Sequence, residues 1–174
     1  MFQSMSGGDG LFEERSAVAL GFVTLAFALA TFVSCRSCLT FLGRLGIKNL
    51  TETRRYRAFY RYHGYYWSAF LITLPVHLIL ALVHTGLPMA GDPDAPVHWV
   101  ILSFALASVV STGVVFSSCR SLVRVFALMM KRRPLINPSY RVFYGYHAYF
   151  WAVLMLAIAG HFAAANVHIG FWPK

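Results

Sequence analysis

Long stretches without a charged side chain alternate with short basic segments along this chain of 174 residues. The uncharged stretches cover residues 16–35, 62–91, 95–119 and 142–173. About 20 mostly apolar residues in a helix cross the roughly 30 Å of hydrocarbon in a bilayer. Segments such as LILALV lack the alternation of apolar and polar residues that barrel strands require. The pattern therefore predicts transmembrane helices near 16–35, 62–86, 98–119 and 145–170.

Composition supports a membrane protein. Hydrophobic residues make up 58% of the chain and charged residues 12%, against about 25% charged in an average soluble domain. A soluble domain of this size exposes too much of its surface to carry that composition. We therefore predict an all-α membrane protein with a single membrane domain over residues 1–174. The first stretch lacks the basic flank of a signal peptide, since Asp9, Glu13 and Glu14 precede it. We therefore expect that it is not cleaved and remains in the mature protein.

The basic residues are concentrated in two loops. The net charge is +9, which by itself would suggest a protein that binds nucleic acid. In the connection between the second and third helices, the only charged residues are Asp92 and Asp94. The positive-inside rule predicts a multi-pass protein of the plasma (inner) membrane, with cytoplasmic basic loops and both termini outside. We expect anionic membrane lipid, and no nucleic acid, as the partner of these loops. They hold 13 of the 15 cations, namely Arg36, Arg44, Lys48, Arg54, Arg55, Arg57 and Arg61, then Arg120, Arg124, Lys131, Arg132, Arg133 and Arg141.

The chain contains an internal repeat with an offset of 84 residues. Ser34-Cys35-Arg36-Ser37 recurs as Ser118-Cys119-Arg120-Ser121, and aromatic and histidine positions continue the match. Repeat one covers approximately 16–90 and repeat two approximately 98–174. Each repeat has two spans, so both have the same orientation. The sequence thus predicts a four-transmembrane-helix bundle built from two parallel helix-pair repeats.

Six of the seven histidines belong to the repeat. Each second helix of a repeat contains His-x13-His-x6-His, and at 100° per residue the three side chains share one face. Along the helix axis, the first and second histidines are roughly 21 Å apart and the second and third roughly 10.5 Å apart. Ionisable side chains inside a membrane suggest function; hydrogen bonding between helices is the alternative. His98 lies outside the repeat, and we assign it no role. The repeated histidines are His63, His77 and His84 with His147, His161 and His168.

Paired imidazoles on two parallel helices suit bis-histidine haem, because haem iron takes one axial ligand from each side of the ring. Arg57, Arg61 and Arg141 lie close in sequence to the first pair and are candidates to bind haem propionates.

His-x13-His on two parallel helices resembles the dihaem core of membrane b-type cytochromes, both the cytochrome b subunit of quinol oxidoreductases and the ferric reductase and NADPH oxidase transmembrane domains. This resemblance implies two haem b groups. His63 and His147 would ligate the inner iron, and His77 and His161 the outer iron. The chain has no flavin or nicotinamide domain, so electrons would come from other redox subunits, such as iron-sulfur, flavin or multihaem proteins.

The role of His84 and His168 stays open between several alternatives. They could ligate a third haem, bind propionates of the outer haem, or border a quinone or metal site. They could also replace His77 and His161 as ligands of the outer haem. Pro75 removes a backbone donor two residues before His77, so we expect a kink in that helix.

The three cysteines are Cys35, Cys38 and Cys119. Cys35-x-x-Cys38 has no following histidine for c-type haem attachment, and the repeat replaces Cys38 with Leu122. We predict buried free thiols.

The sequence predicts an electron-transfer subunit that carries electrons across the membrane between two bis-histidine haems within a larger, quinol- or partner-linked complex. It shows no catalytic constellation of its own. The alternatives are a histidine-lined metal or proton pathway, which the absence of carboxylates from the predicted helices disfavours, and a passive haem-containing membrane anchor.

Overall fold

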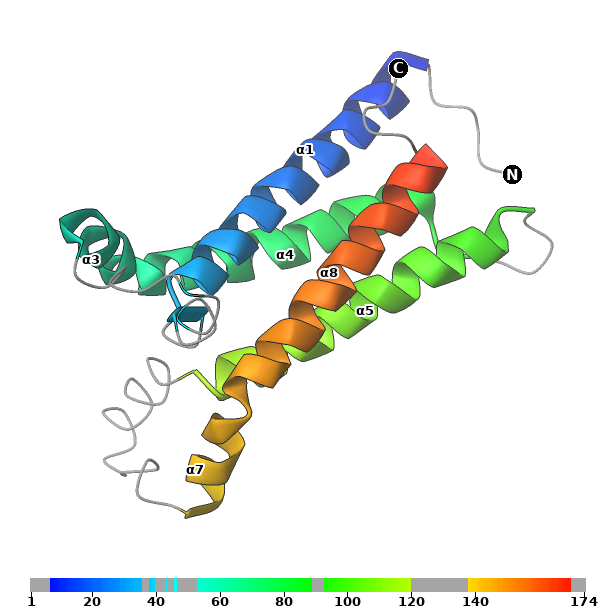
Figure 1. Ribbon diagram of the computed structural model, residues 1–174. Coiled ribbons are helices and arrows are strands. Elements are labelled where there is room, and N and C mark those ends of the chain that lie inside the picture. The colour runs from blue at the N-terminus through cyan, green and yellow to red at the C-terminus, as the bar shows by residue number, and fades with distance from the viewer. Residues whose placement is uncertain are drawn as a thin grey trace, which may run out of the picture.

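The computed structural model describes residues 7–35, 38–39, 43, 46, 53–88, 93–119 and 138–169, with side chains from residue 15 onward and excluding that of 169. All regular structure in these residues is helical. Four long helices are α1 (Gly7–Val33), α4 (His63–Thr85), α5 (Ala95–Ser117) and α8 (His147–Ile169). Two helices of eight residues, α3 (Arg54–Arg61) and α7 (Pro138–Gly145), precede α4 and α8 (Figure 1).

The four long helices are long and apolar enough to cross a membrane over Arg15–Val33, His63–Thr85, Ala95–Ser117 and His147–His168. The predicted all-α class and four spans are therefore confirmed. Many bulky apolar side chains on these helices are exposed, as lipid-facing side chains are, because hydrocarbon solvates them as well as a protein core does. Examples are Ile72, Val83, Val110, Leu156 and Val167.

Local signals set the ends of α4. Tyr62 separates α3 from α4 and donates its backbone N–H to the carbonyls of Phe59 and Tyr60. At the other end Gly86 has φ 69°, a left-handed value that glycine adopts without strain, and its N–H bonds the carbonyl of Leu82. The helix continues through Pro75 from its first residue to its last, so the proline does not interrupt it.

The helices pack as two pairs. α1 lies along α4 and α5 along α8, and among the described residues no contact of similar extent joins one pair to the other. α3 and α7 lie at the same end of these pairs (Figure 1), which we call the basic end, and the opposite end is the far end. The predicted bundle is thus present as two helix pairs, each corresponding to one sequence repeat.

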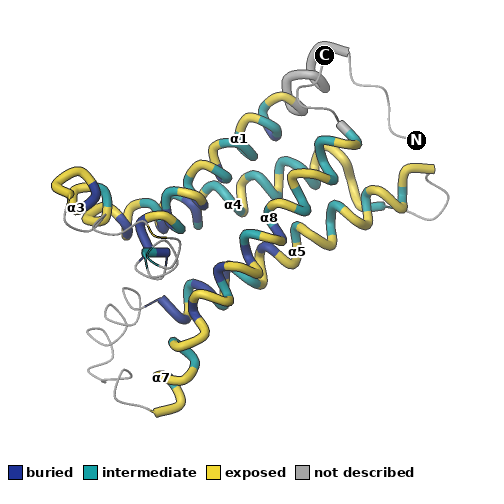
Figure 2. Tube along the Cα trace, viewed as in Figure 1, coloured by how far each residue is buried: buried dark blue, intermediate teal, exposed yellow. Residues whose placement is uncertain are grey.

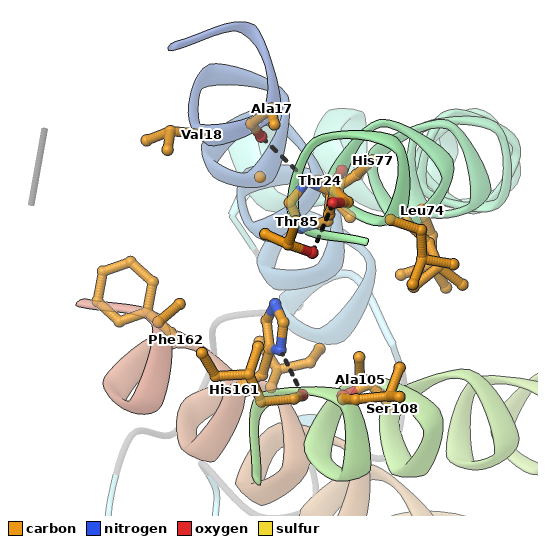
Figure 3. Close-up of a pocket in the computed structure, with 18 of the residues that line it drawn as sticks. Ala17, Val18, Thr24, Leu74, His77, Thr85, Ala105, Ser108, His161 and Phe162 are labelled. Carbon is orange, nitrogen blue, oxygen red and sulfur yellow. Dashed lines mark hydrogen bonds between the residues drawn. The ribbon is translucent and has the colours of Figure 1, made fainter. Parts of the chain in front are cut away.

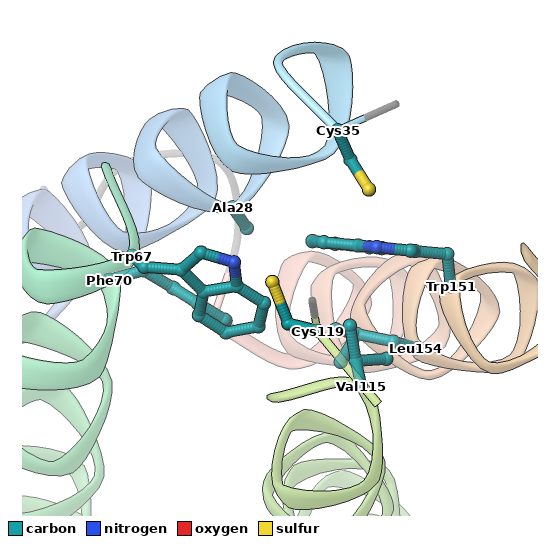
Figure 4. Packing of buried hydrophobic residues seen from close by; sticks show 8 residues of the cluster. All are labelled: Ala28, Cys35, Trp67, Phe70, Val115, Cys119, Trp151 and Leu154. Carbon is teal, nitrogen blue, oxygen red and sulfur yellow. The ribbon is translucent and has the colours of Figure 1, made fainter. Parts of the chain in front are cut away.

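Aromatic residues join the pairs in the half nearer the basic end, where most buried positions gather (Figure 2). Trp67 of α4 and Trp151 of α8 have ring centroids 5.7 Å apart. Trp67 also contacts Phe116 of α5, and Trp151 contacts Phe32 of α1, each at 5.3 Å. With Trp151 fully buried, this aromatic cluster forms the core of the molecule (Figure 4).

Candidate functional site

His63 and His147, the basic-end histidines, begin α4 and α8. Their Nδ1 atoms lie 2.7 and 2.6 Å from the hydroxyls of Ser34 and Ser118. Each serine hydroxyl already donates its one proton to a backbone carbonyl three residues earlier. The serine oxygen must therefore accept from the histidine, so Nδ1 carries the proton and Nε2 has a free lone pair.

Those lone pairs face cysteines of the opposite repeat. His147 Nε2 lies 3.3 Å from Cys35 Sγ, and His63 Nε2 lies 3.8 Å from Cys119 Sγ. Trp151 donates its indole N–H to His147 Nε2 at 3.1 Å, which agrees with an unprotonated Nε2. The indole N–H of Trp67 is buried and has no hydrogen-bond partner in the structure. The two repeats thus exchange matching histidine–cysteine contacts, but only one of the two tryptophans is satisfied.

His77 and His161, the mid-span histidines, are oriented by backbone carbonyls instead. His77 Nδ1 lies 3.0 Å from the carbonyl of Ala17 in α1, and His161 Nδ1 lies 3.2 Å from that of Ile101 in α5. A carbonyl only accepts, so both Nδ1 atoms carry the proton and both Nε2 atoms are free to bind a metal. A hydrogen bond from the second ring nitrogen to a carbonyl is the usual support of a metal-ligating histidine.

The two mid-span rings face each other across the helix pairs (Figure 3), with centroids 6.1 Å apart and planes at 83°. Two nitrogens on opposite sides of one metal are about 4 Å apart, since each metal–imidazole bond is about 2 Å. Each nitrogen lies about 1 Å from the centre of its ring, given C–N bonds near 1.33 Å. Ring centres should therefore be about 6 Å apart when both imidazoles bind one metal, which matches the observed separation.

A mostly apolar cavity surrounds the mid-span histidines. It extends between the pairs and has His77 and His161 in its wall, with small residues such as Ala17, Gly21 and Ala105 beside them. Gly21 is required for close approach, because a Cβ at that position would lie 3.0 Å from His77 Cε1. An apolar slot with two opposed imidazoles meets the requirements of a bis-histidine haem.

The mouth of this cavity contains a histidine pair that the sequence did not reveal. His98 Nε2 lies 3.0 Å from His168 Nε2, with ring centroids 4.8 Å apart. The structure therefore gives His98 a contact with a predicted site residue. His84, the repeat mate of His168, lines the same cavity. The order of the spans in the sequence could have predicted this contact. His98 lies near the start of one helix and His168 near the end of its antiparallel neighbour, so both lie at the same depth.

The candidate propionate residues lie on the two short helices that precede His63 and His147. Arg57 and Arg61 are exposed on α3, and Arg141 is exposed on α7. None of the three lines the cavity around His77 and His161. They lie at the same end of the molecule as His63 and His147 (Figure 1), the pair beside which the sequence predicts them.

All three cysteines are free and buried, so the prediction of buried free thiols is confirmed. Burial raises the pKa of Cys38, which lies outside the spans, to about 11. Within the described part of the chain, no three histidine, cysteine or acidic side chains come together as a metal-ion site.

Fold and site together define a four-span membrane protein with paired histidines inside its spans. No protein-family model, no curated protein and no solved structure matches the chain.

Proposed function

We propose that this chain is a membrane b-type cytochrome, an electron-transfer subunit in which His77 and His161 ligate a haem iron. The observation that carries the proposal is the pair of opposed imidazoles, with ring centroids 6.1 Å apart and each Nδ1–H given to a carbonyl. A bound haem supplies reversible one-electron chemistry at its iron.

The chain's own residues contribute orientation and exclusion of water. The carbonyls of Ala17 and Ile101 fix which nitrogen of each ring faces the cavity, and this support also increases the basicity of the ligand. The mostly apolar lining excludes water from the space between the two rings, and this exclusion would help to set the potential of a bound haem. A histidine-lined cation pathway is less well supported, because no Asp or Glu lies within any of the four spans.

The expected partners follow from this role. We expect other redox proteins, or a quinone, as electron donor and acceptor. We place it in the plasma (inner) membrane with its basic end in the cytoplasm, following the positive-inside rule. The exposed arginines of α3 would then face anionic lipid headgroups.

A reduced-minus-oxidised spectrum of the purified protein tests the proposal. We expect the α-band of a b-type haem, and its loss in the His77→Ala and His161→Ala variants. Val76→Ala is the matched control, since this neighbouring side chain of α4 is exposed and should leave the spectrum intact. A colourless wild-type protein, or an unchanged spectrum in both histidine variants, would refute the proposal.

A further inference from the structure

We propose that the chain binds one haem, between His77 and His161, and that His63 and His147 join the two helix pairs instead of ligating a second iron. This inference rests on the proposed function and departs from the two haems that the sequence predicts. Three features of the basic end support it.

The first feature is the direction of the free nitrogens. A shared iron needs the two Nε2 atoms to face each other through the ring plane. His147 Nε2 instead contacts Cys35 Sγ and accepts the N–H of Trp151, while His63 Nε2 faces Cys119 Sγ. Each lone pair is directed at a side chain from the core.

The second feature is the packing around these histidines. Trp67 and Trp151 follow them by four residues, so each indole lies on the same face about 6 Å further along its helix. A macrocycle held between His63 and His147 would extend into this position. The two indoles occupy it with centroids 5.7 Å apart (Figure 4). Phe32 packs against Trp151 and Phe116 against Trp67.

The third feature is the contrast with the mid-span site. The cavity that contains His77 and His161 does not include His63 or His147 in its wall. His63 and His147 are 7% and 2% exposed and lie against residues that are equally buried. A second haem would therefore have to displace the core that joins the two pairs.

The alternative role of the basic-end histidines follows from their contacts. Each forms a chain from the serine of its own repeat, through the imidazole, to the cysteine of the other repeat. These two chains cross between pairs that otherwise share few helix contacts. They also account for the recurrence of Ser-Cys in both halves, which ligation of haem by histidine does not require.

One haem changes the electron path. The mid-span histidines lie 14 residues, or roughly 21 Å, along α4 and α8 from the basic-end pair. Without a second haem, electrons would enter and leave through the cavity and its far-end mouth, near His98 and His168, and would not cross the membrane through a pair of irons.

Titration of the purified, haem-depleted full-length protein with haemin tests the inference. We expect the b-type spectrum to saturate at one haem per chain and a redox titration to show one component. An end point of two haems, with two components, would overturn this inference but leave the proposed function standing. A protein that binds no haem would overturn both.

Paired variants locate the site independently. We expect His77→Gln with His161→Gln to abolish haem binding, and His63→Gln with His147→Gln to keep the stoichiometry of the wild type. Loss of half the bound haem in the second variant would contradict the inference. If that variant does not fold, the wild-type end point still decides between one haem and two. Cys35→Ser with Cys119→Ser should likewise keep one haem but unfold at a lower temperature.

Discussion

Gly21→Ala separates the stability of the fold from the binding of haem. The new Cβ would lie 3.0 Å from His77 Cε1, whereas ordinary contacts begin near 3.4 Å. The imidazole of His77 must therefore withdraw by about 0.4 Å, which exceeds the roughly 0.2 Å tolerance of a metal–ligand distance. Comparable disturbances around a metal ligand cost roughly 10–100-fold in affinity. Alanine also favours a helix over glycine by about 1 kcal/mol.

The effect on the stability of the haem-free protein and the effect on haem affinity have opposite signs, so the two can be told apart. We expect the haem-free Gly21→Ala protein to be at least as stable as the wild type, while its affinity for haem falls by roughly 10–100-fold. Thermal unfolding measures the first quantity and haemin titration the second. Gly113→Ala in α5 is the matched control, because no atom lies within 4 Å of its added Cβ, so it should gain stability without losing affinity. Equal haem affinity in the two variants would show that His77 is not an axial ligand.

Three further substitutions test the packing and its hydrogen bonds. Gly160→Ala places a Cβ against the ring of Phe104 and should lower the free energy of unfolding by about 1–3 kcal/mol; unchanged denaturation would contradict this. Ser118→Ala leaves the Nδ1–H of His147 without its acceptor and should cost about 1–3 kcal/mol in the same assay. Tyr56→Phe removes a 2.8 Å hydrogen bond to a carbonyl of α1 and should cost about 1 kcal/mol near neutral pH. Burial raises the pKa of Tyr56 to about 12 from about 10, so its contribution is complete below pH 10 and is lost as pH rises through 12. The difference from Tyr56→Phe should therefore shrink over that interval, and a constant difference would refute the assignment.

The pattern of apolar and charged residues predicted the four membrane-spanning helices, because these depend on the hydrocarbon around them. The four spans agree with the structure to within a few residues at most ends, because the cost of placing a charge in hydrocarbon limits where a helix can cross. The facing of His77 and His161 also follows from sequence, since the repeat places equal side chains at equal depth on two parallel helices.

Contacts between the repeats could not be predicted in the same way. A helical period gives the face of a side chain but not the distance to the next helix pair, so the histidine–cysteine contacts and the filling of the basic end by Trp67 and Trp151 had no sequence signature. His98 was missed because the repeat contains no counterpart, although its neighbour His168 was singled out. The duplicated pattern also implied equal roles for His63 and His77, whereas the groups packed around these two histidines differ.

The crossed contacts have a consequence for the origin of the chain. Cys35 with His147 and Cys119 with His63 are the two halves of an isologous interface, in which a residue i contacts j of the partner and j contacts i. A single helix hairpin that dimerised would form both contacts at once and hold a ligand on its symmetry axis. Fusion of two such hairpins would remove the requirement that both halves be identical. Two differences between the halves could be kept only in a fused chain: the indole of Trp67, which has no hydrogen-bond partner, and His98, which has no counterpart in the first repeat.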